Sequence, residues 1–171
     1  METIRPEQHD DIARVRAVNE AAFGQPAEAA IVDAIRERCP DAVSLVAADA
    51  DRIVGHIFFS PVLAPGERGS LPGMGLGPMA VVPEHQRRGI GSRLVRAGIE
   101  AMRERNCPFI IVLGHPEYYP RFGFVPASQH GLTCQWPGVP DAAFMVRVLD
   151  GSKMAGICGT VKYRDEFDQA L

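Results

Sequence analysis

A run of seven residues near the middle of the chain combines the chemical groups that bind a phosphate: Gln86, Arg87, Arg88, Gly89, Ile90, Gly91 and Ser92. Arginine side chains provide positive charge and forked hydrogen-bond donors. Glycines let a ligand approach the backbone closely, and the first-turn amides of a helix attract an anion. Apolar spacing predicts an amphipathic helix from about Arg88 to Arg105. The run is therefore a basic loop at a helix N-terminus.

This helix start is unfavourable unless a ligand completes it. No Ser, Thr, Asp or Asn stands just before the first turn to cap its amides, and arginines at the positive end of a helix dipole are repelled. Gly89 and Gly91 each cost about 1 kcal/mol of helix propensity relative to alanine. A basic surface turn is the alternative interpretation. Strand, turn, glycine loop and helix occur together here, which favours phosphate binding.

The elements around this loop indicate an α/β fold. Met79–Val82 is an apolar strand that Pro83 ends, and Phe109–Leu113 is a second apolar run, typical of a central buried strand. A strand, a helix and a strand of these lengths predict a right-handed crossover between parallel neighbours. A dinucleotide-binding loop over Gly73–Gly77 is disfavoured, because a strand rather than a helix follows those glycines.

The rest of the chain alternates between predicted strands and helices, without a repeat or a linker between domains. The expected strands are Thr3–Ile4, Ala42–Ala48, Arg52–Leu63, Gly123–Pro126 and Ala143–Leu149, and the expected helices are Pro6–Phe23, Pro26–Arg38 and Glu117–Phe122. The buried face of the first helix is expected at Ile12, Val15, Val18, Ala22 and Phe23. Residues 127–141 are polar and rich in Gly and Pro, which predicts a loop. The tail, residues 150–171, is assigned only a short strand within Gly156–Val161.

Size and composition limit the classes of function. The chain has 171 residues, which suits one domain, and its net charge of -3 argues against a general nucleic-acid binder. No apolar run approaches the roughly 18 residues of a membrane span, and no signal peptide is evident. A cytoplasmic protein without a membrane partner is therefore expected. The four cysteines and five histidines show no zinc-type spacing, so no metal site is expected.

The motif Val82-Pro83-x-x-Gln86-Arg87-Arg88-Gly89-Ile90-Gly91 resembles the acyl-CoA-binding signature of the GNAT superfamily of N-acyltransferases. The order of the expected elements matches that family from about Thr3 to Leu149. The resemblance implies a three-layer α/β/α fold with a mixed, mostly antiparallel sheet, in which the fourth and fifth strands are parallel and splay apart. The gap between them is expected to take acetyl-CoA as the cosubstrate.

The resemblance also implies which residues bind acetyl-CoA. Backbone groups of Met79, Ala80 and Val81 are expected to pair with the pantetheine arm, and an amide near Met79 to polarise the thioester carbonyl. The loop amides are expected to hold the pyrophosphate, and Gln86 to shape the loop. The full cofactor-binding set is then Met79, Ala80, Val81, Gln86, Arg87, Arg88, Gly89, Ile90, Gly91 and Ser92.

A second motif, Tyr118-Tyr119-Pro120-Arg121-Phe122-Gly123-Phe124, resembles the family's Tyr-x-x-x-Gly-Phe element. It implies that Tyr119 is the general acid that protonates the leaving thiolate, since a phenol with a pKa near ~10 stays protonated at neutral pH. Aromatic packing is the alternative for this tyrosine. The attacking amine must be neutral, and the candidate bases are His56, His115 and Glu117, beside a water relay. A lone histidine on a strand is more often a packing residue.

Together these features predict an acetyl-CoA-dependent N-acetyltransferase that acts on a primary amine of a small molecule or a peptide, by direct attack in a ternary complex. A CoA-binding regulatory module without turnover is the alternative from another class, and a nucleotide-binding protein is a third. The loops Gly66–Pro72 and Ala127–Asp141 are expected to line the acceptor side. The sequence leaves open the acceptor, the acyl-chain preference and the oligomeric state, with a homodimer among the options.

Overall fold

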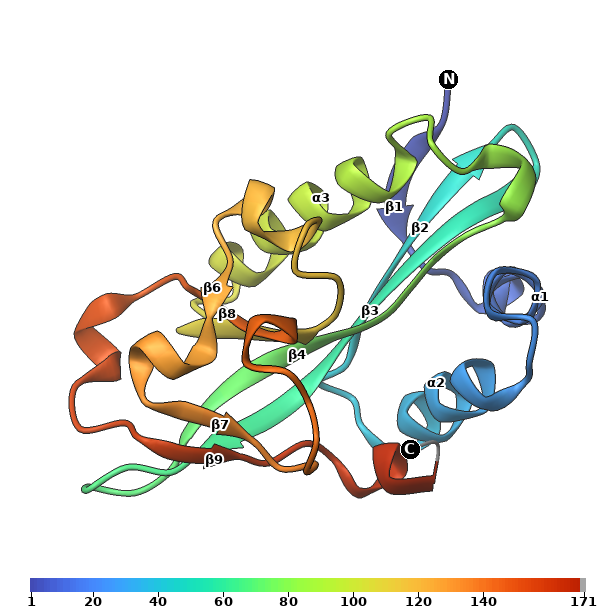
Figure 1. Cartoon of the computed structure of the whole chain (residues 1–171). Helices are drawn as coiled ribbons and strands as arrows, with labels where there is room; N and C mark the ends of the chain where they lie inside the picture. The colour runs from blue at the N-terminus through green and yellow to red at the C-terminus, as the bar shows by residue number, and fades with distance from the viewer. Residues whose placement is uncertain (170–171) are drawn as a thin grey trace. The chain divides into compact units, whose positions relative to one another are not determined.

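The computed structural model describes residues 1–169 (Figure 1), and their contacts cluster into two compact units. Unit 1 comprises Met1–Ser60, Gly77–Gly98 and the segment that begins at Asp165, and unit 2 comprises Pro61–Leu76 and Ile99–Arg164. Three elements are divided between the two units, so that each contributes residues to both: β3 (Arg52–Ala64), β4 (Leu71–Val81) and α3 (Ile90–Glu104). The single domain expected from the sequence stays a prediction, and residues 170–171 of the expected tail lie outside the described part.

Three strands of unit 1 form an antiparallel arrangement. β1 (Thr3–Pro6) pairs with β2 (Val43–Asp49), and β2 pairs with β3. The connection between β2 and β3 turns at Ala50, whose φ of 52° is left-handed. The hairpin expected from the sequence is therefore confirmed.

Two helices lie between β1 and β2 in the sequence of unit 1. α1 (Ile12–Phe23) ends at Gly24, which takes a left-handed φ of 69° and donates its amide to the Glu20 carbonyl. α2 (Ala27–Arg38) follows. The expected start of the first helix at Pro6 is wrong, because the chain first forms a separate 3-10 turn, η1 (His9–Asp11).

The two faces of β3 are covered by different helices of unit 1. Phe58 packs in a cluster with residues of α2 and the turn after it, namely Ile31, Val32, Ile35 and Cys39. The next residue, Phe59, meets α3, since an ideal Cβ on Gly98 would lie 2.4 Å from Phe59 Cζ. Successive strand residues point to opposite faces, so α2 and α3 lie on opposite sides of this sheet (Figure 1). Unit 1 therefore has helix, sheet and helix layers.

The buried face of α1 includes a polar residue. Val15 and Val18 are buried as expected, but Phe23 is 41% exposed at the last position of α1, which corrects its expected place in the core. Asn19 is fully buried instead. Amide side chains are buried at low cost only when they are hydrogen-bonded; the Asn19 nitrogen has two partners, whereas its buried Oδ1 has none among residues 1–169.

Asn19 belongs to a buried cluster that joins α1, β2 and β3. Its Nδ2 donates to the Val15 carbonyl and to His56 Nδ1, each at 3.0 Å. Since Nδ1 accepts, Nε2 carries the ring proton and donates to Ser44 Oγ at 2.9 Å. Burial, with a smaller contribution from the charge of Arg36, lowers the pKa of His56 to about 3. The ring is therefore neutral at physiological pH.

Unit 2 contains strands in the order β4-β5-β8-β6. β5 (Phe109–Leu113) runs parallel to β4, with pairs over Met74–Leu76. β8 (Phe144–Val148) is antiparallel both to β5 and to the short β6 (Val125–Pro126). The parallel pairing predicted for β4 and β5 is therefore confirmed.

The C-terminal tail contributes a strand that local sequence patterns only partly show. β7 (Leu132–Cys134), which follows η4 (Ala127–His130), pairs in parallel with β9 (Gly159–Val161). The prediction of a loop throughout residues 127–141 is therefore wrong, because the partner of β7 is distant in the sequence. The short strand expected within the tail is confirmed. The remaining 3-10 turns are η2 (Pro83–His85), η3 (Tyr119–Phe122), η5 (Asp141–Ala143), η6 (Gly151–Met154) and η7 (Asp165–Gln169).

The burial of His56 predicts a loss of stability in acid. Its pKa in the folded protein, about 3, lies below the ordinary value of 6.5. Between pH 6.5 and about pH 3 the unfolded chain therefore binds one more proton at this residue than the folded chain does. The stability that the neutral ring provides is complete above pH 6.5 and is lost as the pH falls through this range. We expect the free energy of unfolding to fall as the pH drops below 6.5, by about 1.4 kcal/mol per pH unit from this residue. Urea unfolding at several pH values measures this dependence.

The variant His56→Gln provides the comparison, because carboxylates elsewhere also lose stability in acid. We expect it to be less stable than the wild type at neutral pH, since it disrupts the buried hydrogen bonds of the ring with Asn19 and Ser44. Its free energy of unfolding should depend less steeply on pH in the acid range. Equal slopes for the two proteins would show that the folded state does not hold His56 in its neutral form.

Candidate active site

The segment between β4 and α3 is held by its own hydrogen bonds within unit 1. The His85 amide donates to the Val82 carbonyl at 2.9 Å, which closes η2. The Gln86 side chain reaches back and donates from Nε2 to the Val81 carbonyl at 2.9 Å. Gln86 thus ties the start of the basic loop to the end of β4, a geometry that suits the shaping role expected of it.

Two left-handed residues shape the loop itself. Arg87 has a φ of 62° and Gly89 a φ of 81°, whereas φ is not positive at Arg88 between them. Alternation of this kind turns successive amides towards one concave side, an arrangement that binds anions. The Gly89 carbonyl accepts the Arg93 amide at 3.1 Å, so Gly89 occupies the cap position of α3. A glycine has no side chain with which to cap the first-turn amides.

The arginines near the loop divide into two groups. The side chains of Arg87 and Arg88 are exposed, and no hydrogen bond or ion pair joins them to another of residues 1–169. Arg93 instead binds Glu2: its Nη1 donates to the carboxylate at 2.9 Å and its Nη2 to the backbone carbonyl. The backbone amide of Glu2 and the Arg93 side chain lower the pKa of the Glu2 carboxyl. Glu2 therefore neutralises Arg93, whereas Arg87 and Arg88 present their charge to solvent.

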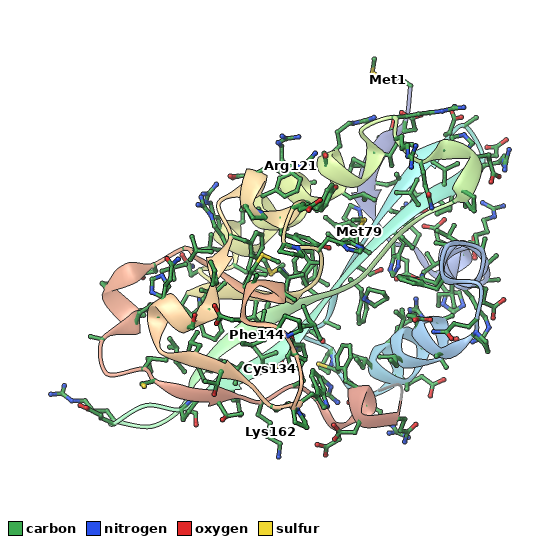
Figure 2. All side chains as sticks on the ribbon, viewed as in Figure 1. Met1, Met79, Arg121, Cys134, Phe144 and Lys162 are labelled. Atoms are coloured by element: carbon green, nitrogen blue, oxygen red, sulfur yellow. The ribbon has the colours of Figure 1, made fainter. Side chains whose placement is uncertain are left out.

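β4 places the residues expected to bind the thioester directly before this loop. Ala80 and Val81 are buried, and Met79, which is labelled in Figure 2, is half-buried. The pairs of β4 with β5 cover Met74–Leu76, and Pro78 follows shortly after. Proline has no N–H to donate to a ladder, so Pro78 itself leaves no unpaired amide, whereas Met79, Ala80 and Val81 after it each carry a backbone N–H.

Tyr119 lies in an aromatic cluster of unit 2. Its ring centroid is 5.1 Å from that of Tyr118, 5.7 Å from that of Phe124 and 6.5 Å from that of Phe122, all with edge-on geometry. Arg121, labelled in Figure 2, stacks its guanidinium 4.7 Å from the Tyr118 ring centroid. Burial, with a smaller contribution from Tyr118, raises the pKa of Tyr119 above its ordinary value of 10.0. The phenol therefore stays protonated at neutral pH.

The candidate bases differ in their access to solvent. His115 and Glu117 are exposed and follow β5 in unit 2. The His115 carbonyl accepts the amides of Tyr118 at 3.1 Å and Tyr119 at 3.4 Å, so its backbone anchors η3. His56, in unit 1, is fully buried and uses both ring nitrogens in hydrogen bonds. This environment favours the packing interpretation of His56, and the base role of either histidine stays a prediction.

The structure brings Met79–Val81 together with Gln86–Ser92 in unit 1, and His115 together with Tyr119 in unit 2. Sequence reasoning missed three residues that contact a candidate site residue or the first turns of α3: Glu2 binds Arg93, Asn19 binds His56, and Gly114 packs against the Tyr119 ring. Glu2 and Asn19 act on partners far away in the chain, so no local spacing indicates them. Gly114 follows β5 directly, where a glycine also suits a simple turn.

Metal-binding groups and membrane-spanning helices are both features of other functions, and neither occurs among residues 1–169. No group of His, Cys, Asp and Glu side chains there is arranged to hold a metal ion. No helix among these residues has the length and apolar character needed to cross a membrane.

Comparisons with known proteins define the family. Residues 3–127 match the model of the acetyltransferase (GNAT) domain. The uncharacterized N-acetyltransferase YhbS of Escherichia coli K12 is 34% identical over 167 residues, which cover 97% of this chain and 98% of YhbS. The uncharacterized N-acetyltransferase YjhQ of the same organism is 37% identical over 161 residues, 91% of this chain and 88% of YjhQ.

Solved structures agree with this assignment. Escherichia coli YhbS in complex with CoA matches with a TM-score of 0.90 at 33% identity, covering 98% of this chain and 92% of that chain. A GNAT family acetyltransferase from Brucella melitensis in complex with acetyl-CoA matches with a TM-score of 0.81 at 33% identity, covering 98% of this chain and 99% of the other. The chain therefore belongs to the GNAT family of N-acetyltransferases, and the fold predicted from the sequence is confirmed.

The left-handed backbone at Gly89 predicts a specific cost for a side chain there. Nothing lies within 4 Å of an ideal Cβ on Gly89, so Gly89→Ala strains the backbone alone, by about 1–2 kcal/mol. Gly24→Ala is the matched case, with a φ of 69° and equally open surroundings, and should cost about the same. Urea unfolding measures both losses.

Gly151→Ala serves as the control for this comparison. Gly151 also has open surroundings, but its φ is not left-handed. Its substitution should change the free energy of unfolding by less than about 0.5 kcal/mol. If Gly89→Ala proved as stable as Gly151→Ala, the left-handed geometry of the loop would be contradicted.

Proposed function

We propose that this chain transfers the acetyl group of acetyl-CoA to a primary amine of a small molecule or a peptide, by direct attack in a ternary complex. The observation that carries the proposal is the loop Gln86–Ser92, with its left-handed backbone at Arg87 and Gly89 and its place at the N-terminus of α3. The CoA complex of YhbS and the acetyl-CoA complex of the Brucella melitensis protein support it.

The donors of this loop suit the pyrophosphate of acetyl-CoA. Amides that point to one side and two exposed guanidinium groups match a ligand with several anionic oxygens. Ile90 is 1% exposed, so its side chain anchors the helix start while its amide belongs to the first turn. The backbone of Met79–Val81 is assigned to the pantetheine arm, as the family resemblance implies.

The transfer needs no covalent enzyme intermediate. The amine nitrogen forms a bond to the acetyl carbon, and the carbon–sulfur bond of the thioester breaks. The thiolate takes a proton, and we assign its donor to Tyr119, because this tyrosine occupies the position that the Tyr-x-x-x-Gly-Phe resemblance implies for the acid and its phenol is protonated at neutral pH. The proton lost by the amine restores the phenol through solvent, so protons and charges balance over the cycle.

The base that accepts the amine proton is assigned first to His115. It is exposed and lies in the same unit as Tyr119, whereas His56 is fully buried. A water relay is the alternative, because a free amine that is already neutral needs only a route for its proton to solvent.

Calorimetric titration with acetyl-CoA tests the cofactor assignment. We expect binding by the wild type, and roughly 10- to 100-fold weaker binding by Gly89→Asp, because the new carboxylate faces the phosphates and the loop geometry is strained. Gly24→Asp adds the same charge at a left-handed glycine of unit 1 outside the loop and should bind as the wild type does. Thermal unfolding confirms that each variant is folded.

The outcomes of this titration separate the functional classes. Absence of acetyl-CoA binding by the folded wild type would refute the acyltransferase proposal. If Gly24→Asp and Gly89→Asp weakened acetyl-CoA binding equally, the assignment of the phosphate site to the loop would be contradicted. Tight binding without turnover of any amine in a broad panel would favour the regulatory module.

The variant Tyr119→Phe tests the general acid. With the best acceptor from the amine panel, we expect kcat to fall by about 100-fold or more, since a positioned acid typically contributes that much. The affinity for acetyl-CoA should stay within about twofold of the wild type. Release of free CoA thiol measures kcat. If the variant kept the wild-type kcat, a group other than Tyr119 would be the proton donor.

A further inference from the structure

Gly114 makes room for the Tyr119 ring within unit 2. An ideal Cβ on Gly114 would lie 2.4 Å from Tyr119 Cε2, 3.0 Å from Cδ2 and 3.4 Å from Cζ. Non-bonded carbon atoms prefer separations of about 3.5–4.0 Å. The flank of the ring therefore rests directly on the backbone of Gly114, where no other residue type fits without a shift.

The backbones on both sides of this contact are fixed. The Gly114 amide donates to the Ala143 carbonyl at 2.9 Å, which fastens the end of β5 to the residue before β8. The Tyr119 amide donates to the His115 carbonyl at 3.4 Å, and the Tyr118 amide shares that acceptor at 3.1 Å. A side chain at position 114 is therefore accommodated by moving the Tyr119 ring rather than the chain.

The ring itself has little space in which to move. Tyr118 meets it edge-on with an interplanar angle of 88°, and Phe124 meets it at 73°. Phe124 is 1% exposed and Phe122 is 7% exposed, so both belong to the packed core. Together with Gly114, these rings fix the plane of the phenol and hence the position of its hydroxyl.

We infer that Gly114 is a positioning residue for the general-acid step. This inference rests on the proposed function, in which Tyr119 donates its hydroxyl proton to the CoA thiolate. Displacement of a catalytic group by about 1 Å can cost about 100-fold in rate. The role of Gly114 is therefore to hold the hydroxyl where the proton is needed, although Gly114 itself offers no reactive group.

Gly73 provides a matched control from the same unit. An ideal Cβ on Gly73 would lie 2.4 Å from Phe109 Cζ, the same kind of contact with a ring that carries no hydroxyl. Phe109 is fully buried. Gly73→Ala and Gly114→Ala should therefore both lower stability by overpacking, whereas only Gly114→Ala should act on the acid.

The test is a double-mutant cycle of Gly114→Ala and Tyr119→Phe in the full chain. It uses acetyl-CoA with the best acceptor of the amine panel, and slow hydrolysis of acetyl-CoA as a readout that needs no acceptor. Gly114→Ala should lower kcat by about 10- to 100-fold and leave the calorimetric Kd for acetyl-CoA within about twofold. It should lower kcat no further in the Tyr119→Phe background, since both changes then remove the same contribution.

The contrary outcomes are distinct from one another. Three outcomes would overturn the inference while leaving Tyr119 as the acid. They are a loss of kcat in the double variant equal to the product of the two single losses, a wild-type kcat in Gly114→Ala, and a loss of kcat in Gly73→Ala as large as that in Gly114→Ala. A wild-type kcat in Tyr119→Phe would defeat the proposed acid and the inference with it. If Gly114→Ala does not fold, Tyr119→Leu in that background should restore folding by removing the clash, and failure to do so would overturn the inference.

Discussion

The first turn of α3 begins at a residue that cannot cap it. Gly89 accepts the Arg93 amide through its carbonyl but has no side chain to offer the amides of that turn. The surrounding residues are consistent with this constraint: Gln86 fixes the chain entering the loop, Glu2 neutralises Arg93 beside the helix dipole, and the Ile90 side chain is buried. This helix start suits the anionic ligand that we propose for the loop.

The rigid base for this loop is the sheet of unit 1, in which β3 has both faces buried. Phe58 and Phe59 point to opposite faces of the strand, so Phe58 packs against α2 and Phe59 packs against α3. His56 adds a polar connection on the same strand, because its two ring nitrogens join Asn19 of α1 and Ser44 of β2. A neutral, fully satisfied histidine is compatible with this apolar setting, whereas a charged one is not.

Glycines opposite aromatic rings recur in both units. Gly98 faces Phe59 in unit 1, and Gly73 faces Phe109 in unit 2. In each case the missing Cβ lets a large ring lie against the backbone, which fills the core without a void. Gly114 lets the Tyr119 ring lie against the backbone in the same way. At this position the packing also fixes the ring of the residue that we propose as the general acid.

Local patterns in the sequence were enough for the basic loop and the β2–β3 hairpin, because glycine and apolar spacing are properties of neighbouring residues. The parallel β4–β5 pair followed from the order strand, helix, strand, and the GNAT family from the resemblance of two motifs to the family's signatures. Only the tertiary structure showed that Glu2 engages Arg93, that Asn19 and Ser44 satisfy His56, that β7 pairs with β9 and that Tyr119 rests on Gly114. Most of these contacts join residues far apart in the chain. Even the short separation of Gly114 and Tyr119 depends on how η3 folds back, which residue types alone do not encode.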